Sequence, residues 1–74
     1  MTNYTAKEII EIGTRNGGGP ANFNNGTNWS DIYTMPNGDK VEMYYNVPDM
    51  PDGTIDDLPD EFWQNPAIIE VNAD

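Results

Sequence analysis

Negative charge limits the folding of this chain more than any other feature of its sequence. Thirteen acidic residues stand against three basic ones in 74 positions, and histidine is absent, so the formal net charge at pH 7 is -10. Self-repulsion at this charge density opposes compaction of the chain. Because stability does not call for so many acids, we expect the charge to serve the binding of a partner.

Length and residue types limit what the fold can contain. We expect residues 1–74 to form a single small domain with a thin core, because a chain of this size buries only about 60% of its unfolded surface. Cysteine is absent, which excludes disulfides, thiolate zinc sites and cysteine nucleophiles. The additional lack of histidine removes the usual ligands of transition metals. We therefore predict no cofactor and no metal site.

The first predicted element is a helix with a marked start. Thr5-Ala6-Lys7-Glu8 has the sequence of a capping box, in which the Thr5 hydroxyl accepts from the Glu8 backbone N–H and the Glu8 carboxylate accepts from the Thr5 N–H. Glycines and a proline at positions 16–20 should end the helix. Residues 16–28 should form a loop anchored by Phe23. A phosphate-binding loop is disfavoured, because these glycines follow a helix and no lysine follows them.

The strongest local signal is a β-hairpin. Residues 32–35 and 41–45 are β-prone, and the Asn37-Gly38 pair between them is typical of a two-residue type I′ turn. Such a turn pairs Thr34 with Val41 and Ile32 with Met43. The expected core face consists of Ile32, Thr34, Val41, Met43 and Tyr45. The opposite face, suited to contact with a partner, consists of Tyr33, Met35, Lys40, Glu42 and Tyr44.

Prolines divide the remainder of the chain. Pro48, Pro51, Pro59 and Pro66 prevent a long helix, although a single helical turn suits residues 59–63. Residues 67–71 indicate a short strand beside the hairpin, and the edges of the core should be closed by Trp29, Phe62 and Trp63. The predicted fold class is therefore α+β. One N-terminal helix packs on a small three-stranded antiparallel sheet, and a Pro/Asp-rich loop precedes the last strand.

Six acidic residues occupy one short window that contains no basic residue: Asp49, Asp52, Asp56, Asp57, Asp60 and Glu61. A solvated loop is the commonest structure for such a run. Residues 52–56 also resemble the middle of an EF-hand calcium loop, where glycine makes the turn and an apolar residue follows. Proline or methionine stands at the corresponding ligand positions 48, 50 and 59, and the bidentate glutamate is missing. A degenerate carboxylate site for a divalent cation is the weaker alternative.

A third interpretation of the acidic window is mimicry of a nucleic acid. Carboxylates on alternate residues of an extended segment lie about 6–7 Å apart, because a strand rises about 3.3 Å per residue. This separation is close to the phosphate spacing along one nucleic-acid strand. The carboxylates would then pair with the Arg and Lys side chains of a protein that normally holds DNA or RNA.

The same composition disfavours several other classes of function. No histidine or cysteine can act as a base or nucleophile, and Ser30, the only serine, has no candidate base. A surface this negative repels DNA, RNA and anionic lipid, and no apolar run approaches the roughly 20 residues that span a bilayer. We predict no enzyme activity and no direct binding to nucleic acid or membrane. Because no signal peptide is recognisable, we expect a location in the cytoplasm of the producing cell or of an infected host.

In size, acidity and lack of catalytic groups, the chain resembles phage-encoded inhibitors, among them anti-CRISPR and anti-restriction proteins that imitate DNA. The likeness is one of composition, and it implies an inhibitor that binds the basic surface of a nucleic-acid-handling enzyme. The expected contact residues are the six acids of the window together with Tyr33 and Tyr44. The alternative is a non-enzymatic virion or complex subunit, in which acidity serves solubility and the Tyr33–Met35–Tyr44 face makes the interface. A further alternative is adaptation to a salty environment.

Overall fold

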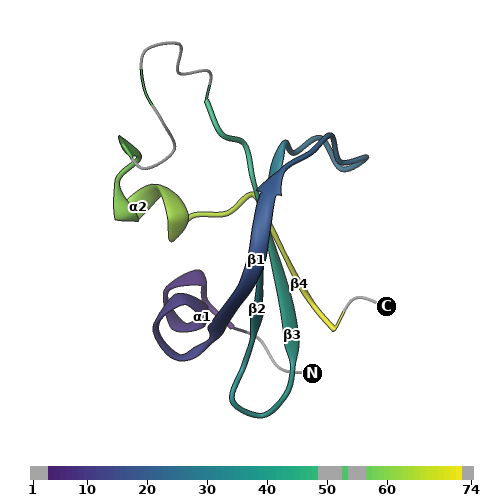
Figure 1. The fold of residues 1–74 in the computed structure, drawn as a ribbon, viewed down its shortest axis with the longest axis vertical. Helices are drawn as coiled ribbons and strands as arrows, with labels where there is room; N and C mark the ends of the chain where they lie inside the picture. Colours follow the sequence, from purple (N-terminus) through teal and green to yellow (C-terminus); the bar gives the residue numbers. More distant parts are fainter. Residues whose placement is uncertain (1–3, 49–52, 54–56, 73–74) are drawn as a thin grey trace.

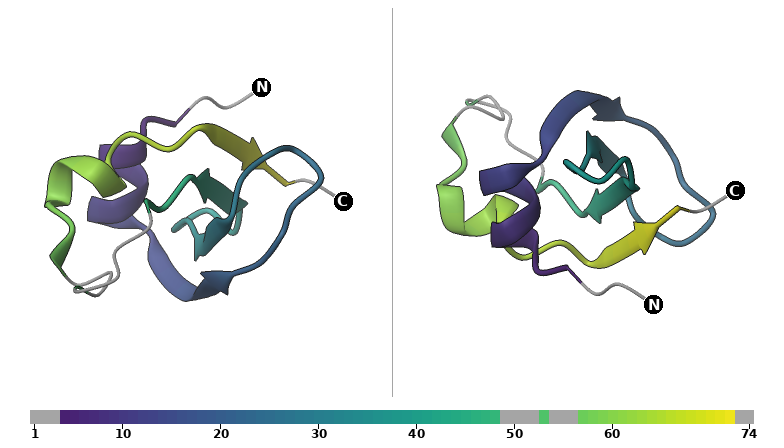
Figure 2. Two further views of the ribbon diagram at one scale, coloured as in Figure 1. Left: turned by 90° about the horizontal axis from the view of Figure 1, so that it is seen from above. Right: turned by 90° about the horizontal axis from the view of Figure 1, so that it is seen from below.

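The structure is a computed structural model that describes residues 4–48, 53 and 57–72. These residues form one antiparallel sheet of four strands, in the order β1-β2-β3-β4, and two short helices (Figure 1). The elements along the chain are α1 (Ala6–Ile12), β1 (Thr14–Pro20), β2 (Trp29–Thr34), β3 (Lys40–Tyr45), α2 (Asp60–Trp63) and β4 (Ile68–Val71). Figure 2 shows both helices on the same side of the curved sheet. The α+β class is confirmed, but the sheet has one strand more than predicted.

Helix α1 begins as its sequence predicts. The Thr5 hydroxyl accepts from the Glu8 backbone N–H at 3.2 Å, and the Thr5 N–H donates to the Glu8 carboxylate at 3.4 Å. The helix ends at Ile12, earlier than expected, and the Gly13 N–H donates to the Ile9 carbonyl at 2.9 Å. A Cβ at Gly13 would lie 2.6 Å from that carbonyl. A side chain at position 13 would clash with this carbonyl. Glycine avoids the clash, so strand β1 can begin directly after the helix.

Strand β1 occupies the glycine-rich segment that was expected to be a loop. It pairs antiparallel with β2, with Pro20 opposite Trp29 and a register shift between Arg15 and Gly17. Because β1 lies at the edge of the sheet, the missing N–H of Pro20 takes no hydrogen bond from a strand on the other side. Only residues 21–28 form the connecting loop. The glycine and proline content misled the prediction, since it favours loops in general but also suits an edge strand.

The hairpin between β2 and β3 forms, but its register differs by one residue from the predicted one. Val41 pairs with Tyr33 rather than with Thr34. Side chains alternate between the two faces of a strand, so this shift exchanges the faces of β2 relative to β3. Tyr33 and Met35 lie in the core, whereas Ile32 is 37% exposed on the outer face. The predicted pairing and the predicted composition of both faces were wrong for β2.

The turn of this hairpin explains the shift. The Met35 N–H donates to the Asp39 carbonyl at 2.8 Å, which leaves residues 36–38 as a three-residue loop. Of these residues only Gly38 has a positive φ, of 94°, whereas a type I′ turn needs positive φ at both central residues. Pro36 suits the start of a type I turn, because its ring holds φ near about -65°. Gly38 then supplies the left-handed residue that follows such a turn in three-residue hairpin loops.

Asp39 joins the N-terminal segment, the hairpin turn and the end of β4. Its carboxylate accepts from the Asn72 side chain at 2.9 Å, from the Tyr4 hydroxyl at 2.8 Å and from the Asn37 side chain at 3.2 Å. These three bonds, that of Asn72 above all, favour the ionised form and lower the pKa of Asp39. The acidic group thus has a structural role in this fold.

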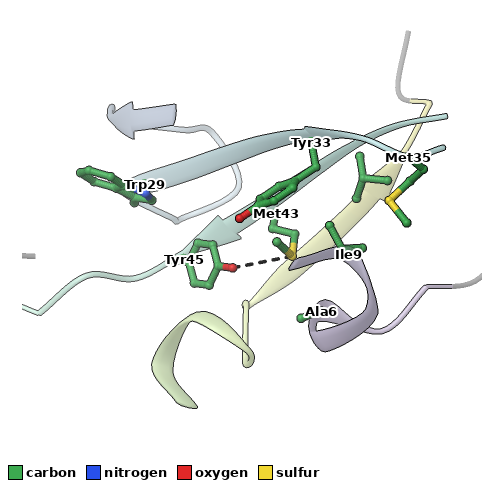
Figure 3. Packing of buried hydrophobic residues seen from close by; sticks show 8 residues of the cluster. Ala6, Ile9, Trp29, Tyr33, Met35, Met43 and Tyr45 are labelled. Carbon is green, nitrogen blue, oxygen red and sulfur yellow. Dashed lines mark hydrogen bonds between the residues drawn. The ribbon is translucent and has the colours of Figure 1, made fainter. Parts of the chain in front are cut away.

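The core lies between the sheet and α1, where Met35 and Met43 pack with Ala6 and Ile9 of the helix (Figure 3). Its fully enclosed side chains are Tyr45, Ile9, Met35, Met43 and Val41.

The predicted helical turn and last strand are both present, as α2 and as β4 beside β3. The Tyr45 hydroxyl donates to the Trp63 carbonyl at 2.6 Å, and its ring stacks on Phe62 with centroids 5.6 Å apart. These contacts hold α2, because four residues cannot form a stable helix alone.

Candidate functional site

The structure describes three of the six acids in the predicted contact window. Asp57, Asp60 and Glu61 are all exposed, and the last two form the first turn of α2. Consecutive residues of a helix point in different directions, so this pair does not form the extended row expected for mimicry of a phosphate strand. Asp49, Asp52 and Asp56 lie outside the described residues, as does the calcium-like segment 52–56 except for Gly53.

The two tyrosines predicted to share a contact face lie on opposite faces of the sheet. Tyr33 faces the core and is 8% exposed, beside Met35 at 2%. Tyr44 lies on the outer face, but it is only 9% exposed, and Phe23 packs edge-on against it with ring centroids 4.9 Å apart. The predicted Tyr33–Met35–Tyr44 face is therefore wrong, because the three-residue loop turns two of its members inward. Phe23 does anchor its loop, as expected.

A pocket of about 540 Å³ opens where α2 meets α1 and the β1–β2 part of the sheet. Its volume lies within the range of about 300–1,000 Å³ that is typical of ligand pockets. Trp29 and Trp63 have ring centroids 6.0 Å apart, and they are the only two tryptophans of the chain. The walls combine three aromatic side chains with three charged ones, namely Trp29, Tyr33, Trp63, Arg15, Asp31 and Asp60.

Asp31 provides the buried charge of this pocket. Its side chain is 9% exposed, whereas that of Arg15 is 51% exposed. One carboxylate oxygen, Oδ1, accepts from Arg15 Nη2 at 2.9 Å and from Trp29 Nε1 at 3.1 Å. Two donors on one oxygen offset much of the cost of burying the charge. Neither bond uses the other carboxylate oxygen, Oδ2, and Asp31 is one of the residues that line the pocket.

Gly18 explains how the ion pair fits against the sheet. It lies opposite Asp31 in the β1–β2 ladder, and a Cβ built on it would overlap Asp31 Oδ1 and lie 2.9 Å from Arg15 Nη2. Absence of a side chain at this position lets the two charged groups meet across β1. The close approach gives a physical reason for one glycine of the run that sequence analysis assigned to a loop.

A second concentration of negative charge lies on the outer face of the sheet. Glu42 and Glu70 are directly opposite each other in the β3–β4 ladder, and both are half-buried. Like charges in this position destabilise a sheet. Burial, followed by a hydrogen bond to Glu42 and by the two negative charges, raises the pKa of Tyr44 beside them. The pair was missed by sequence analysis, because it depends on the register between two strands 28 residues apart along the chain.

The pocket was missed for a similar reason. Arg15 and Asp31 are 16 positions apart, and they meet only because the glycine-rich segment pairs with β2. Burial, and then the charge of Asp31, raise the pKa of Tyr33 above its ordinary value. Chemically, the pocket can accommodate a group that stacks on aromatic rings and carries positive charge.

The described part of the chain contains neither a cluster suited to a metal ion nor a helix that could span a membrane. Within residues 4–48, 53 and 57–72, no three acidic side chains gather closely enough to bind a metal ion. Among the same residues, neither helix has the length or the apolar character needed to cross a bilayer. Comparison of the chain with protein-family models, with curated proteins and with solved structures gives no match.

Proposed function

We propose that this chain is a small acidic interaction protein that binds the basic surface of a nucleic-acid-handling enzyme and inhibits it, in the manner of phage anti-CRISPR or anti-restriction proteins. The observation that carries the proposal is the imbalance of charge, -10 over 74 residues. Two of the three basic side chains are engaged internally, Arg15 with Asp31 at 2.9 Å and Lys7 with Glu11 at 4.0 Å. The protein would act in the cytoplasm of the producing cell or of an infected host.

The helical side of the molecule offers the best contact surface for such a partner. Both helices lie on the same side of the sheet (Figure 2), and the exposed acids on or next to them are Glu8, Glu11, Asp57, Asp60 and Glu61. The sheet brings α1 and α2 to one side although they are far apart in sequence. The carboxylate of Asp39, in contrast, is engaged by hydrogen bonds within the fold.

Recognition by this surface would be electrostatic. Acidic side chains at the rim of an interface mainly accelerate association with a basic partner, and salt weakens that effect. A basic groove that holds DNA or RNA presents the required Arg and Lys residues. Binding of the acidic chain there would exclude nucleic acid from the groove. This model also explains why the charge imbalance is tolerated at the expense of stability.

The proposal predicts different effects for two variants that each remove two negative charges. Asp60→Asn/Glu61→Gln changes the helical side, and Glu42→Gln/Glu70→Gln changes the outer face of the sheet. As the probe, proteins retained from the host lysate on DNA-cellulose are eluted and offered to the immobilised chain. Capture should weaken with salt, be competed by duplex DNA and fall more in the helical variant than in the sheet variant. Salt-independent capture without competition, or equal effects of the variants, would overturn the proposal.

The alternative of a virion or complex subunit loses its supporting surface. It required the tyrosine–methionine face, two members of which are buried in the core.

A further inference from the structure

We propose that the pocket between α2 and the β1–β2 part of the sheet binds the guanidinium group of an arginine side chain on the basic partner. The source of the arginine rests on the proposed function, whereas the site itself is argued from its own geometry. The pocket is also the place where the structure brings together a buried carboxylate, an exposed carboxylate and two indole rings. Each of these groups bears on the choice of ligand.

The charge of the pocket favours a cation. Asp31 and Asp60 contribute two carboxylates, against one guanidinium from Arg15. Arg15 and Trp29 both donate to Oδ1 of Asp31, and neither bond uses Oδ2. Because the carboxylate is nine-tenths buried, its attraction for a bound cation is screened less than that of a surface acid. An anionic ligand would meet both carboxylates and the net charge of the whole chain.

The aromatic walls favour guanidinium over ammonium. Trp29 and Trp63 line the pocket, and a cation that approaches the face of an indole is attracted to it. A guanidinium is planar and weakly hydrated, so it can stack on an indole while its edge donates to a carboxylate, whereas an ammonium is compact and strongly hydrated.

The site is held in place before any ligand arrives. The Trp29 N–H donates to Asp31, which fixes the orientation of the ring and of the acid together. Trp63 is held by its carbonyl bond to Tyr45 and by an edge-on contact with the Tyr45 ring at 5.0 Å. Groups that are already ordered lose little conformational entropy on binding, and this favours affinity.

The test uses the whole chain and a small-molecule probe. N-acetyl-arginine amide is titrated while tryptophan fluorescence is recorded, since both tryptophans of the chain line the pocket. A saturable change is expected with this probe. Its neutral counterpart N-acetyl-citrulline amide and the acid N-acetyl-glutamate should cause none. An equal response to the citrulline probe would overturn the assignment to a cation site, and an equal response to N-acetyl-lysine amide would overturn the preference for guanidinium.

Two neighbouring acids of α2 supply matched variants. Asp60 lines the pocket and Glu61 does not. Asp60→Asn should therefore lower the affinity for the arginine probe about two- to fivefold, the range for one exposed ion pair. Glu61→Gln should change the affinity less. Equal effects would mean that long-range charge, not the pocket, attracts the probe. Asp31→Asn is unsuitable as the main test, because it also removes the partner of Arg15.

This titration contains no partner protein, so its result is separate from the test of the proposed function. Failure of the probe to bind would remove the pocket as an arginine site. The proposed capture of basic proteins by surface charge would still be decided by the separate capture experiment with proteins retained on DNA-cellulose.

Discussion

At Gly18 the absence of a side chain is needed because the Arg15–Asp31 ion pair lies close to the backbone, a contact that the residue type alone does not suggest. A Cβ there would lie 2.5 Å from the Ser30 carbonyl and overlap the Arg15–Asp31 ion pair. The neighbouring Gly19 is different, because a Cβ built on it would meet nothing within 4 Å. Two adjacent glycines of one run therefore have different physical roles, and only the first is required by packing.

We expect Gly18→Ala to lower the free energy of unfolding by about 1–3 kcal/mol, the usual cost of forcing extra atoms into a packed site. Gly19→Ala should be neutral or slightly stabilising, because it restricts the unfolded chain without a clash. Urea denaturation of both variants measures the two effects. Equal effects would contradict the close approach of the ion pair to β1.

At the level of elements, the β2–β3 hairpin is determined by its loop. Three loop residues rather than two shift the pairing by one residue, and this decides that Tyr33 rather than Ile32 enters the core. The strand sequences alone permit both arrangements, since apolar residues stand on both faces of each strand. The conformation of the loop thus decides which of the two pairings forms, and this conformation depends on the positive φ of Gly38.

Gly38 offers a clean test of this turn, because a Cβ there would meet nothing within 4 Å. Substitution effects should therefore come from backbone conformation alone. Gly38→Val should lower the free energy of unfolding by about 1–3 kcal/mol, since a β-branched residue is strained at positive φ. Gly38→Asn should cost less, because asparagine tolerates the left-handed region. Thermal unfolding that ranks the two variants equally would mean that the loop has another geometry.

For the molecule as a whole, the proposed function implies that the same charge opposes folding and favours binding. The chain folds against its own repulsion, and part of that repulsion is local, as at Glu42 and Glu70. Binding to a basic partner would use the charge and would relieve the repulsion. A thin core under a large negative charge is therefore consistent with a protein that is stabilised by its partner.

Salt should accordingly stabilise the free protein while it weakens binding. Raising the ionic strength from about 0.01 M to about 0.15 M shortens the Debye length from about 30 Å to about 8 Å. We expect Tm to rise in sodium chloride, where a gain of about 1 kcal/mol corresponds to about 4–8 °C for a chain of this size. The Glu42→Gln variant should have a higher Tm than the unmodified protein at low salt, and its Tm should rise less as salt is added. A Tm that falls with salt would mean that native ion pairs outweigh the repulsion.

The sequence alone determined the features that depend on a few neighbouring residues. The capping box at Thr5 and the short helix after Pro59 were predicted because each rests on hydrogen bonds or backbone limits within one turn. The α+β class and the last strand beside the hairpin followed from the same kind of local signal.

Only the tertiary structure decided β1 and the pocket, whereas the faces of the hairpin follow from the conformation of its three-residue loop. Glycines at an edge strand and in a loop look alike in sequence, and pairing with β2 distinguishes them. Tyr33 moves from the expected surface to the core through one residue of register, because side chains alternate strictly along a strand. Arg15, Asp31 and Trp63 come together from three elements. Their meeting depends on long-range contacts whose energies no local pattern records.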